Sequence, residues 1–432
     1  MNKILPQSEE RKRPLLVSFG NPLLDITAVV KDRSLHDTFQ LPVDGQLEVN
    51  EKQRALFNLV TKEYPVEYTA GGCALNSSRV FCWVLGEPNR VVFVGGIGKD
   101  DEAQKLKAIT QSSGVVNRFV EVDDQPTGTC LALVLGACRC LCADIGAANV
   151  CEPEHVFTPQ FLPVLEETDF IYVEGYFITH SFNTALQIAK YAKQHNKTFV
   201  FNLCGSYVCE NHPNELAELL PYVDILFGYA EEYKTLDRFV DVENLTVQLT
   251  NGQDILPSLL KALRVLKGEE KIKRDKKNIS IDEGNTLVER THQISHDPQF
   301  NHYNGVSSNG IIEELCNGFS NGKLSECNAT NKLSEKTRLM KQKFVIVTNG
   351  PKPLLYVSNG IARERLVPPI SSKKIIDTTG AGDSFVGGFL AALSRGLPLE
   401  QCLDCGTWTA QQLLQQKGCT LPSYPATFFG ED

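Results

Sequence analysis

The sequence predicts an α/β protein whose core is a mostly parallel, doubly wound sheet. Beyond residue 157, short apolar segments alternate with helical patterns, and the segments are 170–173, 198–202, 223–227, 343–348 and 354–357. This alternation is typical of parallel strands joined by crossover helices on both faces of a sheet. The chain has 432 residues, 42% of them hydrophobic, which is enough to bury a core of that size. Ligands of such sheets bind beyond the carboxyl ends of the strands.

Composition narrows the possible function classes. The net charge of −9 argues against nucleic acid or an anionic membrane as the main partner. The first 13 residues are polar, unlike a secretory signal, and the sequence has no apolar run long enough to span a bilayer. We therefore expect a cytoplasmic protein, with the nucleus left open as a second location, and expect its 14 cysteines to be reduced. Cys402 and Cys405 resemble half of a metal or redox site, but without a clear second half a buried apolar role is favoured.

The first strand, at 15–19, ends in a turn that carries two polar residues, Asn21 and Asp25. Turn chemistry alone would explain them, because Asn-Pro and Asp favour turns. The alternative is that Asp25 is a carboxylate that accepts two hydrogen bonds from a vicinal diol such as a ribose. A loop at 42–47 and a helix at 51–62 follow.

Two glycines then open a helix that runs to Trp83. Gly71 and Gly72 would let a ligand approach the backbone closely, and Asn76 lies one turn further, where it could reach the same ligand. A glycine pair alone is a weak signal. The pattern continues with a strand at 91–94, a turn at 95–98 and a helix at 101–113.

The segments 129–135 and 139–145 have the alternation of two paired strands. Along the second, Arg139, Leu141 and Ala143 lie on one face and three cysteines lie on the other. Arg139 is either a surface residue of an edge strand or a cation over a phosphate, with the two apolar residues packed on a base or sugar. The thiol face is more simply part of the core than a metal site.

One long stretch breaks the strand–helix pattern. Residues 268–340 are rich in Asn, Ser, Lys and Glu and have no usable periodicity. They are expected to form a disordered insertion, and a regulatory or partner-binding loop is the alternative. We therefore divide the chain into a flexible tail at 1–13, one folded domain at 14–267 and 341–432, and the insertion.

The stretch DTTGAGDSFVGGF at 377–389 carries the strongest functional signal. Ile375 and Ile376 lead into it as the end of a strand would, and Gly380 and Gly382 allow a turn that other residues resist. The turn should present free backbone N–H groups at a helix start, where the dipole favours an anion. Asp383 is then either a plain helix cap or a general base beside a phosphate site, and the full motif favours the base. The motif lacks the GKS or GKT of a Walker P-loop, and the first strand lacks the GxGxxG turn of a dehydrogenase.

Seven motifs, taken in order, resemble the PfkB (ribokinase-like) sugar and nucleoside kinases, and in particular the eukaryotic adenosine kinases: GNPLLD, AGGCALNS, QPTGTC, CRCLCADIGAAN, PYVDILFG, IIDTTGAGDSFVGGF and KGCTLP. The resemblance covers nearly the whole chain apart from the tail and the insertion. It implies a ribokinase-like, Rossmann-type fold with a small β-rich lid, built from segments within about 20–50 and 125–149. It also implies ATP-dependent phosphorylation of the adenosine 5′-hydroxyl to AMP, as in purine salvage, by a monomer that uses Mg²⁺.

The same resemblance assigns roles to residues of this sequence. Asp383 matches the catalytic base, Gly380, Ala381 and Gly382 match the anion hole, and Arg139 matches a lid arginine that meets the phosphates. The adenosine-binding set comprises Asn21, Asp25, Leu47, Gly71, Gly72, Cys73, Asn76, Cys130, Leu141, Ala143, Tyr176 and Thr379. The ATP-binding set comprises Asn202, Tyr229, Thr348 and Gly350, and Glu232 is expected to help organise Mg²⁺.

A few positions depart from the family's pattern. Tyr229 stands where the family usually has the asparagine of Asn-x-x-Glu, although Glu232 is kept. Cys73 stands for a serine and Thr379 for an asparagine, changes that touch nucleobase selectivity more than the chemistry. Two rivals stay open: a PfkB kinase for another nucleoside or sugar, and a nucleoside-binding protein with weak or no kinase activity, which Tyr229 alone supports.

Overall fold

The computed structural model describes most of the chain, namely residues 13–43, 45–136, 138–248, 254–272 and 343–430. Nearly all of the tail predicted at 1–13 and of the insertion predicted at 268–340 lies outside these residues. Within the described ranges, every helix is too short or too polar to cross a lipid bilayer.

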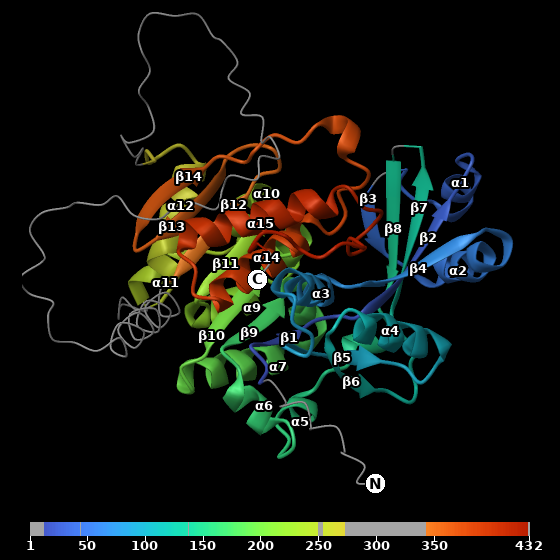
Figure 1. Cartoon of the computed structure of the whole chain (residues 1–432), viewed down its shortest axis with the longest axis horizontal. Coiled ribbons are helices and arrows are strands. Elements are labelled where there is room, and N and C mark those ends of the chain that lie inside the picture. Colours follow the sequence, from blue (N-terminus) through green and yellow to red (C-terminus); the bar gives the residue numbers. More distant parts are fainter. Residues whose placement is uncertain (1–12, 44, 137, 249–253, 273–342, 431–432) are drawn as a thin grey trace, which may run out of the picture.

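A nine-stranded sheet forms the body of the molecule (Figure 1), with the strand order β14-β13-β12-β11-β10-β9-β1-β5-β6. The seven strands from β12 to β6 in this order are parallel, and β13 and β14 add an antiparallel edge. The predicted parallel sheet is therefore confirmed. Its strands are β1 Leu16–Phe19, β5 Val91–Ile97, β6 Val116–Glu121, β9 Phe170–Glu174, β10 Thr198–Asn202, β11 Ile225–Tyr229, β12 Phe344–Thr348, β13 Leu354–Ser358 and β14 Ile361–Arg365.

Helices cover both faces of this sheet and bury two separate apolar layers. One face packs against α5 Pro153–Val156, α6 Leu162–Glu167, α7 Gly175–Gln194, α8 Ser206–Asn211, α9 Pro213–Leu219, α10 Ala230–Phe239, α11 Val242–Gln248 and α12 Leu256–Leu266. The other face packs against α3 Cys73–Leu85, α4 Asp101–Ser112, α14 Ala381–Ser394 and α15 Leu399–Leu413. Helix α14 is buried all round, because it lies between α3, α15 and the sheet. Cys402 and Cys405 are buried on α15, as the apolar interpretation predicted.

A second, five-stranded sheet stands beside the body as a small lid (Figure 1), with the order β3-β8-β7-β2-β4. Its strands are β2 Leu23–Val29, β3 Gly45–Glu48, β4 Val66–Gly71, β7 Thr129–Leu135 and β8 Cys138–Asp144. Helices α1 Ser34–Phe39 and α2 Glu51–Glu63 cover one face of it and close a third apolar cluster. Cys140 and Cys142 belong to that cluster, so the prediction that the thiol face of this strand is core is confirmed.

Three local predictions were wrong. The predicted turn at 95–98 is mostly strand, because β5 continues to Ile97 and pairs with β6 from Val92 to that residue. The predicted loop at 42–47 includes β3, which gains hydrogen bonds from β8. Ile375 and Ile376 do not end a strand: they are exposed, and the Ile376 N–H donates to the carbonyl of Leu414 at 2.8 Å rather than to a neighbouring strand.

Candidate active site

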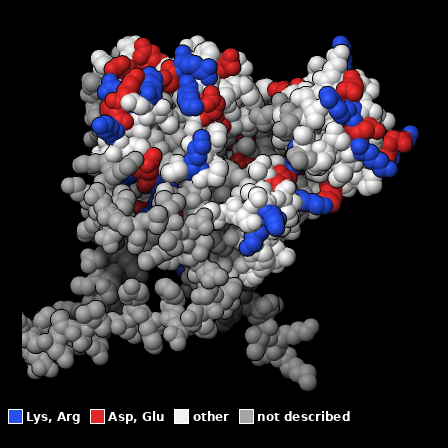
Figure 2. All heavy atoms as spheres, turned by 90° about the horizontal axis from the view of Figure 1, so that it is seen from above, with Lys and Arg blue, Asp and Glu red and all other residues white. Residues whose placement is uncertain are grey.

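A cavity of about 1140 Å³ lies where the lid faces the carboxyl ends of the central strands. Its wall includes all but two of the residues predicted for function: Asn21, Asp25, Leu47, Gly72, Cys73, Asn76, Cys130, Leu141, Ala143, Tyr176, Asn202, Tyr229, Glu232, Thr348, Gly350, Thr379, Gly380, Ala381, Gly382 and Asp383. Gly71 and Arg139 lie outside this wall. On the face seen in Figure 2, acidic and basic side chains are interspersed, so the drawn residues form no continuous basic track there.

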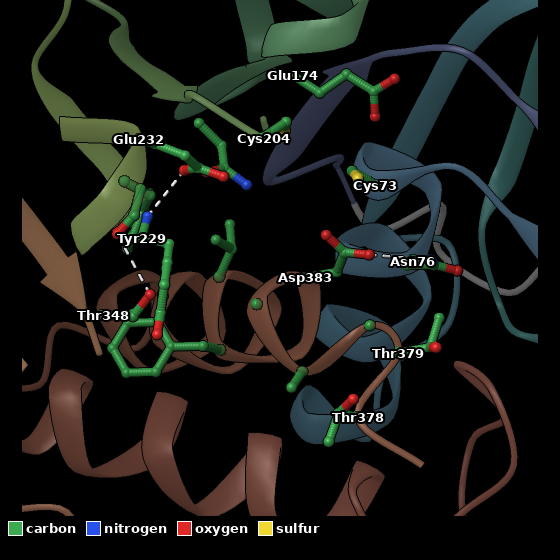
Figure 3. Close-up of a pocket in the computed structure, with 18 of the residues that line it drawn as sticks. Cys73, Asn76, Glu174, Cys204, Tyr229, Glu232, Thr348, Thr378, Thr379 and Asp383 are labelled. Atoms are coloured by element: carbon green, nitrogen blue, oxygen red, sulfur yellow. Dashed lines mark hydrogen bonds between the residues drawn. The ribbon is translucent and has the colours of Figure 1, made fainter. Parts of the chain in front are cut away.

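The N-terminus of α14 points into this cavity (Figure 3). Gly380 is the helix cap, with φ +75°, and a Cβ there would lie 2.8 Å from Cβ of Cys419, so only glycine fits. A Cβ at Gly382 would meet nothing within 4 Å, so the first turn opens onto free space. An open helix N-terminus with this geometry can bind an anion through its backbone N–H groups and dipole.

Asp383 lies two residues into α14 and is 9% exposed. The Asn76 side-chain amide donates to its Oδ2 at 3.0 Å (Figure 3), although the two residues are far apart in the sequence. Burial raises the pKa of Asp383 to about 6, and the hydrogen bonds from Asn76 and Cys73 oppose that rise. A carboxylate with this pKa, beside an anion site, is suited to accept a proton near neutral pH.

Asp25, on the lid strand β2, faces the same cavity. Burial raises its pKa to about 7, while the nearby charges of Arg139 and Arg79 lower it. Gly71, on the adjacent strand β4, packs against this carboxyl group so closely that a Cβ there would lie 2.1 Å from Oδ1. Gly71 therefore acts as a spacer for Asp25 behind the wall of the cavity, which explains why it does not line it.

The turn at Gly72 brings α3 against the strand that precedes Asp25. Gly72 has φ +95°, and a Cβ there would lie 2.2 Å from the carbonyl oxygen of Asn21. The side-chain amide of Asn21 in turn donates to the carbonyl of Tyr176 at 3.2 Å. Glycine is therefore required at this position, where α3 begins on the cavity wall.

The lid side of the cavity is mainly apolar. Its residues come from β3, β7 and β8, namely Leu47, Cys130, Leu141 and Ala143. Opposite them, the rings of Tyr176 and Tyr207 stack with centroids 5.5 Å apart. Flat apolar walls with a few polar groups suit a planar base or sugar.

Arg139 is not among the residues that line the cavity. Its guanidinium forms a part-buried ion pair with Asp377, which also accepts hydrogen bonds from the backbone N–H groups of Thr379 at 2.9 Å and Gly418 at 2.8 Å. The arginine therefore connects lid strand β8 to the loop before α14. Its role toward a phosphate stays a prediction.

At the other end of the cavity, Tyr229 and Thr348 are the last residues of β11 and β12, and Glu232 and Gly350 come shortly after them. The Tyr229 N–H donates to Oε2 of Glu232 at 2.8 Å, which caps helix α10 (Figure 3). Burial raises the pKa of Glu232 to about 7. Tyr229 is 47% exposed, so about half of its surface faces solvent although it lines the cavity.

Glu174, at the end of β9, is a cavity residue that the sequence patterns did not reveal. It is 1% exposed and accepts hydrogen bonds from the backbone N–H groups of Asn21 and Ala74. Burial raises its pKa to about 8, and these two bonds oppose the rise. A single acidic residue at the end of an apolar strand gives no local signal of such a role.

Cys204 is the second residue of this kind, and it follows β10 in a left-handed conformation, with φ +63°. Its thiol hydrogen-bonds to that of Cys73, and this bond together with burial raises the pKa of the Cys73 thiol. Both thiols therefore stay protonated at neutral pH and line the cavity as small, weakly polar groups.

Comparison with known proteins agrees with this geometry. The pfkB family of carbohydrate kinases matches residues 45–254 and 319–427. Adenosine kinase 1 of Arabidopsis thaliana is 27% identical over 95% of this chain and 97% of its own length, and the adenosine kinase of Saccharomyces cerevisiae is 28% identical over 95% and 97%. The solved structure of Anopheles gambiae adenosine kinase, in complex with P1,P4-di(adenosine-5) tetraphosphate, is 30% identical, covers 98% of this chain and 99% of its own, and has a TM-score of 0.68.

The fold and the site thus define a small-molecule kinase of the ribokinase-like class, and the chain belongs to the pfkB family of carbohydrate kinases. Within that family it is similar over nearly its full length to adenosine kinases of plants, fungi and an insect.

Proposed function

We propose that this protein transfers the γ-phosphoryl group of ATP to the 5′-hydroxyl of adenosine, giving AMP and ADP. One observation carries the proposal: the Asp383 carboxylate lies beside the open N-terminus of α14, in the same cavity as the Asp25 carboxylate and an apolar lid wall. The full-length similarity to adenosine kinases supports adenosine as the acceptor.

Different residues of the cavity bind the acceptor, accept its proton and stabilise the transferred phosphoryl group. Asp25 binds the ribose hydroxyls and the apolar lid residues pack on the base, so that the 5′-hydroxyl faces Asp383. Asp383 accepts the hydroxyl proton, and Asn76 holds the carboxylate in place through its 3.0 Å hydrogen bond. The backbone N–H groups at Gly380–Asp383 stabilise the charge on the transferred phosphoryl group. The lid over the cavity excludes water, which would otherwise compete as the acceptor.

The ATP end of the cavity is compatible with Mg²⁺. Among the described residues, no group of three or more His, Cys, Asp or Glu side chains could hold a metal by itself. Mg²⁺ is more often held by substrate phosphates and water with one or two carboxylates, and Glu232 offers such a carboxylate. A cation beside Glu232 would lower the pKa that burial raises. When bound, Mg²⁺ would neutralise phosphate charge, and Thr348 and Gly350 would lie along the nucleotide.

The direct test is ADP formation with ATP, Mg²⁺ and adenosine, compared with a reaction that lacks an acceptor. Adenosine-dependent turnover is expected, and Asp383→Asn should lower it by about 10²-fold or more while adenosine still binds in calorimetry. Near-normal turnover of Asp383→Asn would contradict the base assignment. Turnover on other ribonucleosides or on ribose, with none on adenosine, would redirect the proposal to another pfkB substrate.

A second candidate, a nucleoside-binding protein without useful kinase activity, is favoured by Tyr229 alone. Tyr229 lines the cavity, yet its backbone N–H still donates to Glu232 in the α10 cap. Turnover of the Tyr229→Asn variant decides between the kinase and the binding protein. A large gain in turnover would show that Tyr229 impairs the enzyme, and unchanged turnover would show that Tyr229 is tolerated.

A further inference from the structure

Glu174 is a carboxylate buried in the cavity without a role in the mechanism above. It is the last residue of β9, and its side chain lines the cavity (Figure 3). Oε1 accepts from the Asn21 N–H at 2.6 Å, and Oε2 accepts from the Ala74 N–H at 2.5 Å. Two backbone donors, one on each oxygen, stabilise the ionised carboxylate and oppose the rise of its pKa to about 8, because a protonated carboxyl group would present its own hydrogen to one of them.

The hydrogen bond from the Ala74 N–H to Glu174 caps the start of helix α3. Helix α3 begins after Gly72, which is its N-cap residue and provides no side-chain hydrogen bond to the helix. It cannot do so, because φ +95° and the 2.2 Å approach to the Asn21 carbonyl restrict the position to glycine. The Ala74 N–H is one of the free donors at that helix start. Glu174 therefore supplies from β9 the cap that Gly72 cannot, and the helix dipole favours its negative charge.

The second bond ties the same carboxylate to the root of the lid. Asn21 lies in the turn between β1 and β2, four residues before Asp25. Glu174 thus joins the two segments that enclose the proposed ribose site: the β2 segment with Asp25, and the start of α3 with Asn76. The arrangement is tight, since a Cβ at Gly20 would lie 2.6 Å from the Glu174 carboxyl carbon.

We propose that Glu174 is a positioning residue for the acceptor nucleoside, which sets the spacing between Asp25 and Asn76 without touching the reacting atoms. The inference rests on the proposed function for its substrate, and on the two hydrogen bonds for its mechanism. Glu174 acts on the acceptor side of the cavity, and the ATP-side residues of β11 and β12 are held by other contacts.

The test compares Glu174→Gln with a matched buried carboxylate elsewhere. Asp224→Asn is that control. Asp224 accepts a hydrogen bond from the Phe199 N–H at 2.7 Å and pairs with Lys343. It lies just before β11, at the amino ends of the strands, whereas the cavity lies at their carboxyl ends. Glutamine keeps the shape of Glu174 but turns an N–H₂ group toward one of the two donors. At about pH 9, above the Glu174 pKa of about 8, the carboxylate is mostly ionised. At that pH we expect KM for adenosine to rise about tenfold to a hundredfold, the effect of losing one hydrogen bond to a charged group, with a much smaller change in kcat and in KM for ATP.

Hydrogen exchange gives a readout that does not depend on the substrate. In the free protein, peptides that contain Asn21 and Ala74 should exchange faster in Glu174→Gln than in the wild type, and Asp224→Asn should leave both unchanged. Unchanged exchange at both peptides would overturn the proposal, as would equal rises in KM for adenosine and for ATP, which indicate a general loss of structure. A wild type without adenosine-dependent turnover would refute the proposed function instead, and the exchange result would still decide whether Glu174 holds the two segments.

Discussion

Replacing Gly71 with alanine should damage the site through a single contact. The new Cβ would lie 2.1 Å from Oδ1, 2.4 Å from Cγ and 2.6 Å from Oδ2 of Asp25, whereas real Cβ atoms essentially never approach closer than 3.0 Å. Gly71 is buried at the end of β4 and is not among the residues with positive φ, so alanine adds no backbone strain of its own. The Asp25 carboxyl group must therefore move by about 1 Å, because the strand backbone holds the alanine in place.

A shift of that size has a predictable effect on the proposed reaction. Misplacing a positioning group by about 1 Å can lower the rate by about 10²-fold, which corresponds to about 2.7 kcal/mol of transition-state stabilisation. We expect kcat/KM for adenosine to fall by about this factor in Gly71→Ala, since Asp25 would no longer meet the ribose hydroxyls. The assay is steady-state ADP formation over a range of adenosine concentrations.

A double-mutant cycle isolates the cause. In an Asp25→Ala background the carboxyl group is absent, so alanine at position 71 has room and should add little further loss. The reasoning fails if Gly71→Ala has near-normal kcat/KM, or if it lowers kcat/KM by the same factor with and without Asp25.

Three further predictions concern other parts of the site. Burial raises the pKa of Asp25 from 3.8 to about 7, so between these pH values the folded protein holds a proton there that the unfolded chain releases. The free energy of unfolding should therefore fall as the pH rises from about 4 to about 7, by up to about 1.4 kcal/mol per pH unit. Urea titrations at several pH values should show this fall in the wild type, and Asp25→Asn should lack this contribution. Gly380→Ala should lower kcat by about tenfold or more, because its φ of +75° and the nearby Cys419 side chain force the α14 start to shift; normal kcat would show that the turn tolerates a Cβ. Arg139→Gln would break the ion pair between Arg139 and Asp377 and should weaken closure of the lid. The rate of ATP hydrolysis in the absence of an acceptor should then increase, and an unchanged rate would contradict a closing role for Arg139.

The sequence by itself determined the class of fold and much of the site. Alternating apolar strands and helical patterns require a parallel sheet with helices on both faces, and that periodicity is a local property of the chain. Cavity residues such as Gly72, Asp383 and Leu141 were found because their signals are also local: a glycine turn before a helix, an acidic residue after a second glycine turn, and alternation along a strand.

The tertiary structure decided which distant groups meet. Glu174 is the last residue of an ordinary apolar strand, and it gains two backbone partners only because β9 packs beside the turn between β1 and β2 and beside the start of α3. Arg139 has the strand face that the pattern predicted, but its partner Asp377 comes from far along the chain. Ile376 has the β-branched side chain of a strand residue, yet it meets the carbonyl of Leu414 instead of a strand edge. Such pairings follow from how whole layers pack, because hydrogen bonds and burial depend on neighbours in space that short sequence patterns do not encode.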